Sequence, residues 1–477
     1  MEKILFAASE AHPFAKTGGL GDVAYSLPKA LRKLGVDARV ILPKYLQIPS
    51  NFKSRMQHIA DFTVPVGWRQ KYCGLECYDF NDVPFYFIDN EYYFKRNKLY
   101  GFFDDGERFS FFSRAVLESM RYMGNFFPDI IHCNDWHTGM IPVLLNEHYK
   151  KNNEYTNVKT IFSIHNLKYQ GVFPKEILSE LLCLGDEYFN EGALKYYDAI
   201  SFMKAGINFS DIITTVSRSY AEEIKTPFYG ETLDGLLNSK SYKLHGIVNG
   251  IDYEIFDPSK DKHIYYRYNT SNVYEKIRNK TRLQKILNLP ENKSVPVIAM
   301  VTRLVKQKGL DLVASIIQEL LAMDIQLVVL GSGDENYQDL FQYFSHIYPS
   351  KLSANIKFDD DLASKIYAGS DMFLMPSLFE PCGIGQLISL RYGTIPIVRE
   401  TGGLKDTIIP YNEYTGEGNG FSFANYDAHE MLNAIKYAVK IYENKKAWSD
   451  IMKRAMLENN SWENSAKTYI DLYKTLI

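Results

Sequence analysis

Cysteine is scarce in this sequence, and its spacing matches no metal-binding pattern. Five cysteines stand among 477 residues, and only Cys73 and Cys77 lie close together. This spacing excludes the usual zinc motifs, and the odd number is typical of free thiols in a reducing compartment. We therefore expect a cytoplasmic protein with reduced cysteines.

Long apolar runs and a surplus of one charge are also missing. No uncharged apolar stretch approaches the roughly 18 residues of a membrane span, and the N-terminal apolar run is broken by Ser9 and Glu10 too early for a signal peptide. The formal net charge is only −3, so the chain has no global basic field for nucleic acid. We expect neither a membrane nor a nucleic acid as a partner.

Short apolar runs alternate with helix-period segments along nearly the whole chain. This rhythm predicts parallel β-sheets covered by helices on both faces. The apolar spacing in residues 308–324 predicts an amphipathic helix. Between residues 60 and 95 three runs break the rhythm, and we expect an antiparallel insertion there.

A domain boundary is predicted near Asn249. The apolar run before it ends at Asn249-Gly250, and a polar, tyrosine-rich segment without clear strands follows until Val295. The chain is also long enough for two large domains. We predict doubly wound α/β domains at residues 1–248 and 249–460 with a cleft between them, and ligands at the carboxyl ends of their strands.

A glycine-rich turn follows the first apolar run, with the sequence KTGGLGDV. Gly18, Gly19 and Gly21 do not fit the dinucleotide fingerprint, and Lys16 precedes them, whereas the Walker A lysine follows its glycines. Open backbone N–H groups at a helix N-terminus favour an anion or a sugar hydroxyl. A turn that needs glycine only for its backbone angles is an equally good interpretation of this stretch.

Four further loops at predicted strand ends carry many polar side chains. They are NDWHTG with Asp135, HNLKYQG with His165 and Asn166, TRLVKQKG with Arg303 and Lys308, and LFEPCGIGQ with Glu380, Cys382 and Gly383. Both halves of the chain contribute, which favours a site in a cleft closed by two domains. His165 is equally consistent with a base or ligand and with a structural hydrogen bond.

Arg303 and Lys308 stand at the start of a predicted helix. Cations there oppose the helix dipole, which indicates an anionic partner. A guanidinium fork and an ammonium group both suit a diphosphate, and together they can neutralise a departing nucleoside diphosphate without a metal. The alternative is a pair of solvated charges.

Glu380 precedes a helical segment and allows two interpretations. Its carboxylate either caps the helix or binds sugar hydroxyls and stabilises positive charge on an anomeric carbon. EPCG follows one buried strand and TGGLKD follows the next, which favours a nucleotide-sugar pocket. We expect Cys382 to pack rather than act as a nucleophile, because no basic residue adjoins it. The acidic run 359–361 is expected to cap a helix rather than bind a metal.

Taken together, the motifs make the chain resemble the bacterial glycogen synthases and the plant starch synthases. The matching stretches run in the family's order from residue 16 to about residue 423 and are KTGGLGDV, NDWHTG, HNLKYQG, VNGID, TRLVKQKGLDLV, LGSGD, LFEPCG, GTIPIVRETGGLKDT and GFSF. The resemblance implies two Rossmann-like domains of the GT-B type facing across a cleft, with the final helix, 461–477, crossing back onto the acceptor-side domain 1–248. Residues 249–460 would hold the donor.

The resemblance also implies an activity and roles for single residues. Glucose would pass from ADP-glucose to the non-reducing end of an α-1,4-glucan with retention at the anomeric carbon, without a metal or another cofactor. Arg303 and Lys308 would hold the diphosphate, and Glu380 would bind the transferred glucose. Asp135, His165 and Asn166 would line the glucose side, His165 through its backbone carbonyl. The remaining implied substrate-binding residues are Lys16, Gly18, Gly19, Asp22, Tyr100, Asn249, Gly333, Cys382 and Gly383.

Other functions stay open beside this one. A related transferase could use a UDP- or GDP-sugar, and a catalytically silent glucan-binding scaffold could share the fold. The scaffold predicts loss of Lys16, Lys308 or Glu380, yet all three are present. A phosphorylase is disfavoured because no lysine fits a pyridoxal pattern. The expected partners are ADP-glucose and glycogen, and an oligomer is compatible with the sequence.

Overall fold

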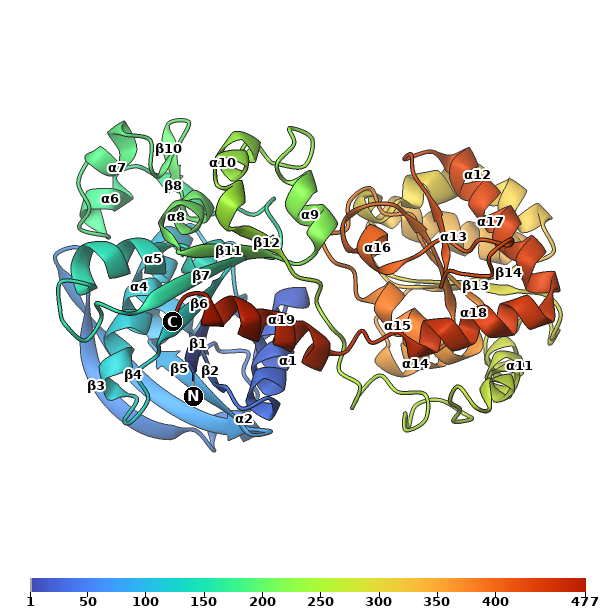
Figure 1. Cartoon of the computed structure of the whole chain (residues 1–477), viewed down its shortest axis with the longest axis horizontal. Helices are drawn as coiled ribbons and strands as arrows, with labels where there is room; N and C mark the ends of the chain where they lie inside the picture. The colour runs from blue at the N-terminus through green and yellow to red at the C-terminus, as the bar shows by residue number, and fades with distance from the viewer. Residues whose placement is uncertain (1) are drawn as a thin grey trace. The chain divides into compact units, whose positions relative to one another are not determined.

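The computed structural model describes residues 2–477, which form two compact units (Figure 1). The first unit ends at Ile247 and also contains Trp462–Ile477, and the second unit is Val248–Ser461. Each unit is built on its own largely parallel sheet with helices packed against it. The predicted α/β class with two doubly wound domains is confirmed.

The first unit contains a nine-stranded sheet. Its spatial order is β12 (Leu244–Gly246), β11 (Ile212–Thr215), β7 (Lys159–Ile164), β6 (Ile130–Asn134), β1 (Lys3–Ala7), β2 (Asp37–Pro43), β5 (Val83–Asp89), β4 (Arg69–Phe80) and β3 (Gln57–Val66). The strands from β12 to β5 are parallel. The chain order reverses between β1 and β6, and such a point leaves a crevice at the carboxyl ends of the strands.

Helices and a small sheet complete this unit. The helices are α1 (Gly19–Lys33), α2 (Ser50–Lys53), α3 (Glu91–Phe94), α4 (Asp105–Ser119), α5 (Met140–Leu144), α6 (Ile177–Glu180), α7 (Glu187–Asn190), α8 (Phe202–Phe209), α9 (Arg218–Glu223), α10 (Asp234–Ser239) and α19 (Trp462–Lys474). The small antiparallel sheet consists of β8 (Val172–Pro174), β10 (Ala199–Ser201) and β9 (Lys195–Tyr196). The C-terminal helix α19 packs against α1, so the last residues of the chain belong to the first unit.

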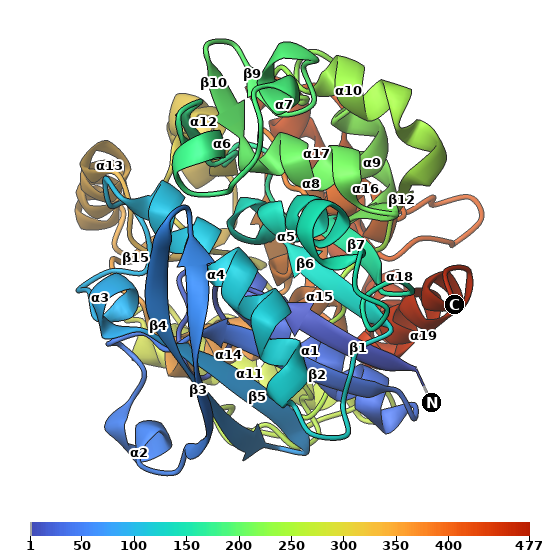
Figure 2. The same cartoon turned by 90° about the vertical axis from the view of Figure 1, so that its left-hand side faces the viewer.

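The segment between residues 57 and 89 differs in part from the expected antiparallel insertion. Strands β3 and β4 form a long antiparallel hairpin, which faces the viewer in Figure 2. Strand β5 is antiparallel to β4 but parallel to β2, with Val40 opposite Phe85. The third run is therefore a strand of the parallel sheet, and only the hairpin is an addition at its edge.

The second unit contains a six-stranded, entirely parallel sheet. Its spatial order is β15 (Leu352–Asn355), β14 (Gln326–Leu330), β13 (Val297–Val301), β16 (Met372–Met375), β17 (Ile395–Arg399) and β18 (Phe421–Phe423). The helices are α11 (Lys276–Ile286), α12 (Leu310–Ala322), α13 (Glu335–Ile347), α14 (Asp360–Gly369), α15 (Gly385–Arg391), α16 (Gly402–Thr407), α17 (Ala428–Glu443) and α18 (Lys445–Leu457). This is the doubly wound order 3-2-1-4-5-6, whose switch point lies between β13 and β16.

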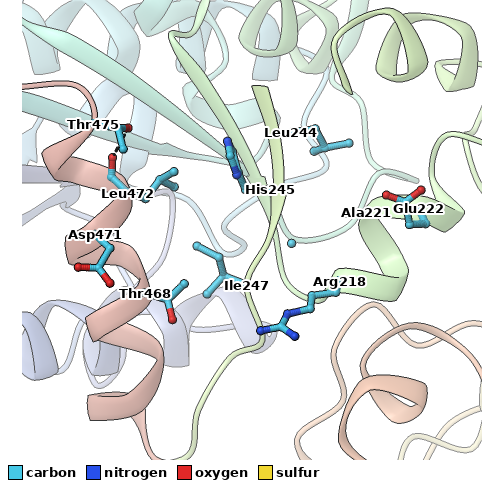
Figure 3. A pocket seen from close by; sticks show the side chains of 11 residues that line it. Arg218, Ala221, Glu222, Leu244, His245, Ile247, Thr468, Asp471, Leu472 and Thr475 are labelled. Atoms are coloured by element: carbon cyan, nitrogen blue, oxygen red, sulfur yellow. Dashed lines mark hydrogen bonds between the residues drawn. The ribbon is translucent and has the colours of Figure 1, made fainter. Parts of the chain in front are cut away.

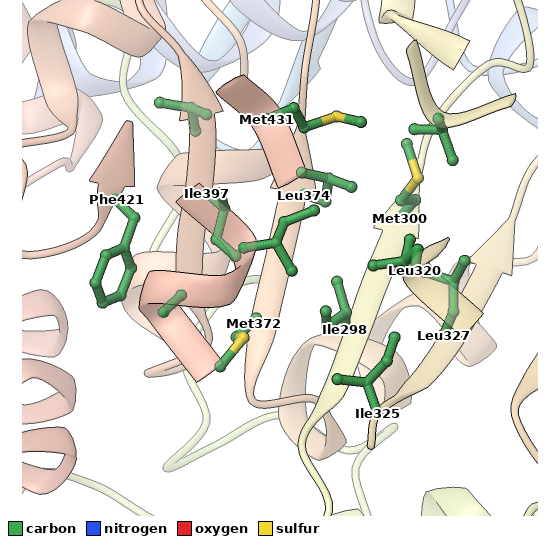
Figure 4. Close-up of a cluster of buried hydrophobic side chains, with 14 of the residues drawn as sticks. Ile298, Met300, Leu320, Ile325, Leu327, Met372, Leu374, Ile397, Phe421 and Met431 are labelled. Atoms are coloured by element: carbon green, nitrogen blue, oxygen red, sulfur yellow. The ribbon is translucent and has the colours of Figure 1, made fainter. Parts of the chain in front are cut away.

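The core of the second unit lies on both faces of this sheet. Ile298 and Met300 of β13 point into one cluster with residues of α12 and α17 (Figure 4). Val297 and Ala299 of the same strand point into the opposite cluster. Because successive side chains of a strand alternate between faces, a strand covered on both faces has to be apolar throughout. The predicted helix in residues 308–324 is confirmed as α12.

No helix among residues 2–477 combines the length and the apolar character needed to cross a lipid bilayer.

Candidate functional site

The polar loops of the first unit follow neighbouring strands at its switch point. Glu10 and Lys16 follow β1, Asp135 follows β6, and His165 follows β7. Because these strands are parallel and adjacent, their carboxyl ends lie at one edge of the sheet. The sheet order alone therefore brings these loops together.

The glycine-rich turn does not need its glycines for backbone angles. Helix α1 begins at Gly19, and Gly18 before it is extended, with φ −153° and ψ −164°. Gly19 has no atom within 4 Å of where a Cβ would stand, and the nearest atom to a Cβ at Gly18 is 3.9 Å away. The turn therefore leaves open space beside the helix N-terminus, which favours close approach of a ligand over the purely conformational interpretation.

Lys16 and Asp22 form an ion pair across this turn, with Lys16 Nζ 2.7 Å from Asp22 Oδ1. A Cβ at Gly21 would lie 2.9 Å from Lys16 Cγ, so this glycine makes room for the lysine stem. Both charged groups are more than one third exposed. Such a pair is weak in water, and Lys16 can exchange Asp22 for an anionic ligand.

Glu10 is a buried member of this loop cluster that no motif in the sequence indicates. Its Oε2 accepts hydrogen bonds from the Thr17 N–H at 2.5 Å and from Thr17 Oγ1 at 2.9 Å. Burial raises the pKa of its carboxyl above the usual value. Glu10 thus anchors the residue just before Gly18. The only signal in the sequence is a carboxylate directly after a predicted strand.

Asp135 joins the loops after β6 and β7. Its backbone has φ +55°, a left-handed conformation that is uncommon for residues other than glycine. Its Oδ1 accepts hydrogen bonds from the backbone N–H of His165 at 2.8 Å and of Asn166 at 3.5 Å. Burial raises the pKa of its carboxyl to about 7. The structure therefore unites three residues that the sequence placed in two separate loops.

The hydrogen bonds of Asn134 determine the tautomer of His165. Asn134 Nδ2 donates to the carbonyls of Ala7 and His132 at 3.1 and 3.0 Å, so its Oδ1 faces His165 Nε2 at 2.9 Å. Burial lowers the pKa of His165 to about 4, so the ring is neutral at pH 7. Nε2 therefore carries the proton, and the structural interpretation of His165 is the one that the structure supports.

Tyr100 lies beside the same loops. Its hydroxyl shares a hydrogen bond with Ser9 Oγ at 2.8 Å, and its ring centroid is 4.3 Å from that of His137. His137 is stacked on Trp136 at 3.9 Å. Both nitrogens of this buried ring lack a hydrogen-bond partner within the described chain, and burial lowers its pKa. His137 is thus a neutral aromatic support for Tyr100.

In the second unit, the loops after β13 and β16 meet at the switch point. Lys308 Nζ lies 2.6 Å from Glu380 Oε2, and Ser377 Oγ donates to the same oxygen at 3.0 Å. The N–H of Leu378 donates to the Gln307 carbonyl at 2.9 Å. Gly309 has φ +74°, and a Cβ there would lie 2.0 Å from the Pro376 carbonyl oxygen. The two loops are therefore packed tightly against each other.

The same geometry excludes one of the two interpretations of Glu380, the helix cap. Helix α15 begins at Gly385 after Ile384, so Glu380 is not its N-cap. The carboxylate binds Lys308 instead. Arg303 is exposed, and its guanidinium has no ion-pair partner among residues 2–477. The expected cation pair therefore consists of one lysine neutralised by a carboxylate and one open arginine.

The other predicted residues of the second unit lie in or next to the loops that follow its strands. Cys382 is buried, and burial raises the pKa of its thiol to about 12, which agrees with a packing role. The backbone of Asn249 forms a hydrogen bond to that thiol, and the buried Asn249 Oδ1 has no partner in the described chain. Gly383 has φ +77°. Gly333 forms a bridge with Leu304, next to Arg303.

The acidic run 359–361 caps a helix, as expected. Asp359 accepts a hydrogen bond from the Leu362 N–H at 2.9 Å and so caps α14. Within residues 2–477, no three His, Cys, Asp or Glu side chains gather in a way that could hold a metal ion. Phe358, just before this cap, follows β15 at the same sheet edge as Arg303 and is 85% exposed. One aromatic residue in a polar loop is a weak signal, so Phe358 does not stand out in the sequence.

A separate hollow lies at the open sheet edge of the first unit, between α9, β12 and α19 (Figure 3). Its volume is about 510 Å³. Arg218, Glu222, His245 and Asp471 contribute charged or polar side chains, and Leu244 and Leu472 contribute apolar ones. It contains none of the residues selected from the sequence, and no aromatic ring other than His245 lines it.

Comparison with known families covers most of the chain. Residues 3–239 match the family described as the starch synthase catalytic domain, and residues 280–455 match the glycosyl transferases group 1. The glycogen synthase of Clostridium acetobutylicum is 62% identical over 476 residues, covering 100% of both chains. That of Clostridioides difficile is 54% identical, covering 99% of both.

Two solved structures resemble the chain over its full length. The catalytic domain of starch synthase IV from Arabidopsis thaliana, bound to ADP and acarbose, matches with a TM-score of 0.90 and 33% identity, covering 100% of this chain and 99% of that one. Sucrose-phosphate synthase from Thermosynechococcus elongatus matches with a TM-score of 0.62 and 17% identity, again covering 100% and 99%. The second likeness concerns the fold alone.

Proposed function

The chain belongs to the glycogen and starch synthase family of glycosyltransferases, and we propose that it transfers glucose from ADP-glucose to an α-1,4-glucan. The glucose joins the non-reducing end of the glucan, and the configuration at its anomeric carbon is retained. The observation that carries this proposal is the Lys308–Glu380 ion pair beside Arg303 at the switch point of the second unit. The ADP-bound starch synthase structure supports ADP as the leaving group.

The ion pair matches the two charges that develop as the donor breaks. The bond between the anomeric carbon and the diphosphate oxygen lengthens, the sugar becomes oxocarbenium-like, and the diphosphate takes the electron pair. Glu380 stabilises the positive sugar, while Lys308 and Arg303 stabilise the negative diphosphate. The acceptor hydroxyl attacks the anomeric carbon and passes its proton to the departing phosphate. The two cations Lys308 and Arg303 would thus supply the positive charge that a metal would otherwise supply, and we propose that the reaction needs no metal.

We assign the donor to the second unit and the glucan acceptor to the first. Asn249, Gly333, Cys382 and Gly383 would shape the donor pocket around the ion pair. The exposed ring of Phe358 offers a flat face to the adenine base. From the first unit, Lys16, Gly18 and Gly19 would contact the donor diphosphate through charge and open backbone.

The remaining first-unit residues would contact sugar or the donor nucleotide. Asp22 and Asn166 supply hydrogen-bonding groups for hydroxyls, and Tyr100 would contact the donor nucleotide. Asp135 holds the His165 backbone at 2.8 Å, so that the His165 carbonyl can accept from a glucose hydroxyl. Since its ring Nε2–H is engaged with Asn134, His165 acts through position rather than as a base.

The five cysteines support a reducing compartment, since all lie in the described chain and none forms a disulfide. We place the reaction in the cytoplasm, with ADP-glucose and glycogen as substrates.

The decisive experiment is an assay of nucleoside diphosphate release. ADP-glucose and UDP-glucose are tested separately, with and without glycogen, and with a chelator throughout. Glycogen-dependent ADP release that survives the chelator supports the proposal. Equal or faster release from UDP-glucose contradicts the donor assignment, and no release despite glycogen binding favours a silent scaffold.

A further inference from the structure

Trp68 and Phe103 are the two most exposed aromatic side chains among the described residues of the first unit. Trp68 is 87% exposed, and Phe103 is fully exposed. A single aromatic residue on a protein surface is common and needs no explanation. Trp68 differs from such residues in two ways: its turn is packed on both sides, and it lies near the loops of the candidate site.

The turn that carries Trp68 is packed on both sides. The Gly67 N–H donates to the Leu181 carbonyl at 2.9 Å, and a Cβ at Gly67 would lie 1.9 Å from the Glu180 carbonyl oxygen. On the other side, Arg69 Nη2 lies 3.6 Å from Glu107 Oε1 of α4. The hairpin tip is thus fixed against α6 and α4, and it presents an indole ring at little cost in conformational entropy.

The hairpin tip lies at the same sheet edge as the loops of the candidate site. Strand β4 pairs Gly74 with Asp89, the last residue of β5. The five residues before Gly74, Arg69 to Cys73, therefore extend past the carboxyl ends of the parallel strands. At the rise of a β-strand, five residues span about 16 Å.

Continuous contacts join this tip to the site. Helix α4 contacts Arg69 through Glu107, and Phe109 of the same helix lies 4.8 Å from His137 and 5.1 Å from Trp136, centroid to centroid. Phe103 lies two residues before the start of α4. Arg69, the neighbour of Trp68, and Phe103 therefore both lie near the first turn of the helix that supports the site.

We infer that Trp68, together with Phe103, is a stacking platform for the acceptor glucan, several glucose units away from its reacting end. This inference rests on the proposed function. Each glucose ring has an apolar C–H face that matches an aromatic ring, and polar side chains around the ring suit its hydroxyls. The residues after Trp68 are polar: Arg69, Gln70 and Lys71. A protein partner would instead need about 800 Å² of complementary surface on each side.

The platform has a consequence for chain length. Long glucans reach from the reacting end to Trp68, whereas short ones such as maltotriose end before it. Loss of the indole ring should therefore weaken the use of glycogen and leave the use of short acceptors intact.

Trp68 also supplies a direct binding signal. The other three tryptophans, Trp136, Trp448 and Trp462, are buried, so acrylamide quenches mainly the fluorescence of Trp68. Glycogen should protect this fluorescence, and maltotriose should not. Trp68→Phe should remove the quenchable fraction. Unchanged quenching in the presence of saturating glycogen would overturn the inference.

The second readout is binding and kinetics of variants. Trp68→Ala should weaken glycogen binding in native gels by about fivefold to tenfold and raise the KM for glycogen similarly. Its turnover with maltotriose and its KM for ADP-glucose should be unchanged. Trp68→Phe should keep most of the affinity. The matched control is Tyr242→Ala. Tyr242 is 76% exposed, but it precedes β12 and so lies at the amino ends of the parallel strands, away from the loops of the candidate site.

The outcomes separate this inference from the proposed function. Wild-type glycogen binding by Trp68→Ala, with a melting temperature like that of the parent, overturns the platform while glucosyl transfer stands. Absence of ADP release from the unmodified protein overturns the proposed function, and the quenching and gel experiments still decide whether Trp68 binds glucan.

Discussion

At the scale of single residues, the two cations of the donor loop are in different states before any substrate binds. Lys308 is neutralised by Glu380 at 2.6 Å, whereas Arg303 is exposed. An exposed guanidinium can capture an incoming diphosphate at once. Lys308 has its greatest effect later, when negative charge grows on the leaving group. Arg303 should therefore govern donor binding more than Lys308 does.

Lys308→Ala tests this division of roles. We expect kcat/KM for ADP-glucose to fall by about a hundredfold or more, because the charge acts mainly in the transition state. Glycogen binding should stay normal. The measurement is steady-state ADP release, and Lys306→Ala is the control because Lys306 is an exposed lysine in the same loop. Near-normal turnover of Lys308→Ala would rule out the leaving-group role.

The raised pKa of Asp135 should make the free energy of unfolding depend on pH. Its pKa is about 7 in the folded chain, above the ordinary value of 3.8. The folded state thus binds more protons than the unfolded state between these values, and this contribution to stability is lost as pH rises from about 4 to 7. Asp135→Asn removes the buried charge, so it should resist urea better than the parent at pH 8.

The same variant has an internal control in its pH profile. The stability difference should shrink toward pH 5, where the parent carboxyl is protonated. A stability difference of the same size at pH 5 and pH 8 would show that the carboxyl of Asp135 does not titrate in this range.

At the scale of elements, two glycine-bearing loops at sheet switch points use glycine for different reasons. Gly309 has a left-handed backbone and touches the Pro376 carbonyl, so it serves packing. Gly19 has neither a positive φ nor a close neighbour. No structural need explains a glycine at this first position of the helix. Its presence therefore favours a ligand that approaches the backbone.

Alanine at each position separates the two uses. Gly19→Ala should leave the free energy of unfolding unchanged or raise it by up to about 1 kcal/mol, yet raise the KM for ADP-glucose. Gly309→Ala should lower the free energy of unfolding by roughly 1 to 3 kcal/mol. Urea unfolding and donor kinetics measure both effects. Full activity of Gly19→Ala would return its turn to a purely conformational role.

At the scale of the whole molecule, the chain passes through the second unit and then returns to the first. A buried hydrogen-bond chain holds the returning helix: Tyr473 OH lies 2.9 Å from His132 Nδ1, and His132 Nε2 lies 2.6 Å from Ser163 Oγ. These hydrogen bonds join α19 to β6 and β7, the strands that Asp135 and His165 directly follow. The last helix therefore stabilises the strands beneath the acceptor-side loops.

Tyr473→Phe should lower the free energy of unfolding of the first unit by about 1 kcal/mol, because it leaves His132 Nδ1 buried without a partner. Removal of residues 462–477 should destabilise it far more. Urea unfolding followed by amide hydrogen exchange of β6 and β7 reports on that unit alone. Tyr242→Phe, which removes an exposed hydroxyl, is the control. Unchanged exchange in Tyr473→Phe would mean that apolar contacts alone hold α19.

Much of the fold follows from local patterns. Residues 308–324 carry a helical stripe, β13 is apolar throughout, and β1 is apolar after Lys3, as strands covered on both faces must be. The pairing of β5 was not predictable in this way. An apolar run looks the same whether its neighbour is parallel or antiparallel, and β5 has one neighbour of each kind.

The candidate site, like the fold, could be predicted only in part from the sequence. The loops rich in glycine, histidine, arginine and glutamate could be identified from composition and from their position after apolar runs, because parallel strands of a doubly wound sheet present their loops at one edge. The partners within those loops depended on the folded chain. Lys308 meets Glu380 across 72 residues, Asp135 binds the backbone of His165, and Glu10 anchors Thr17. Such contacts depend on strand order, which is set by packing over the whole sheet and leaves no trace in the spacing of neighbouring residues.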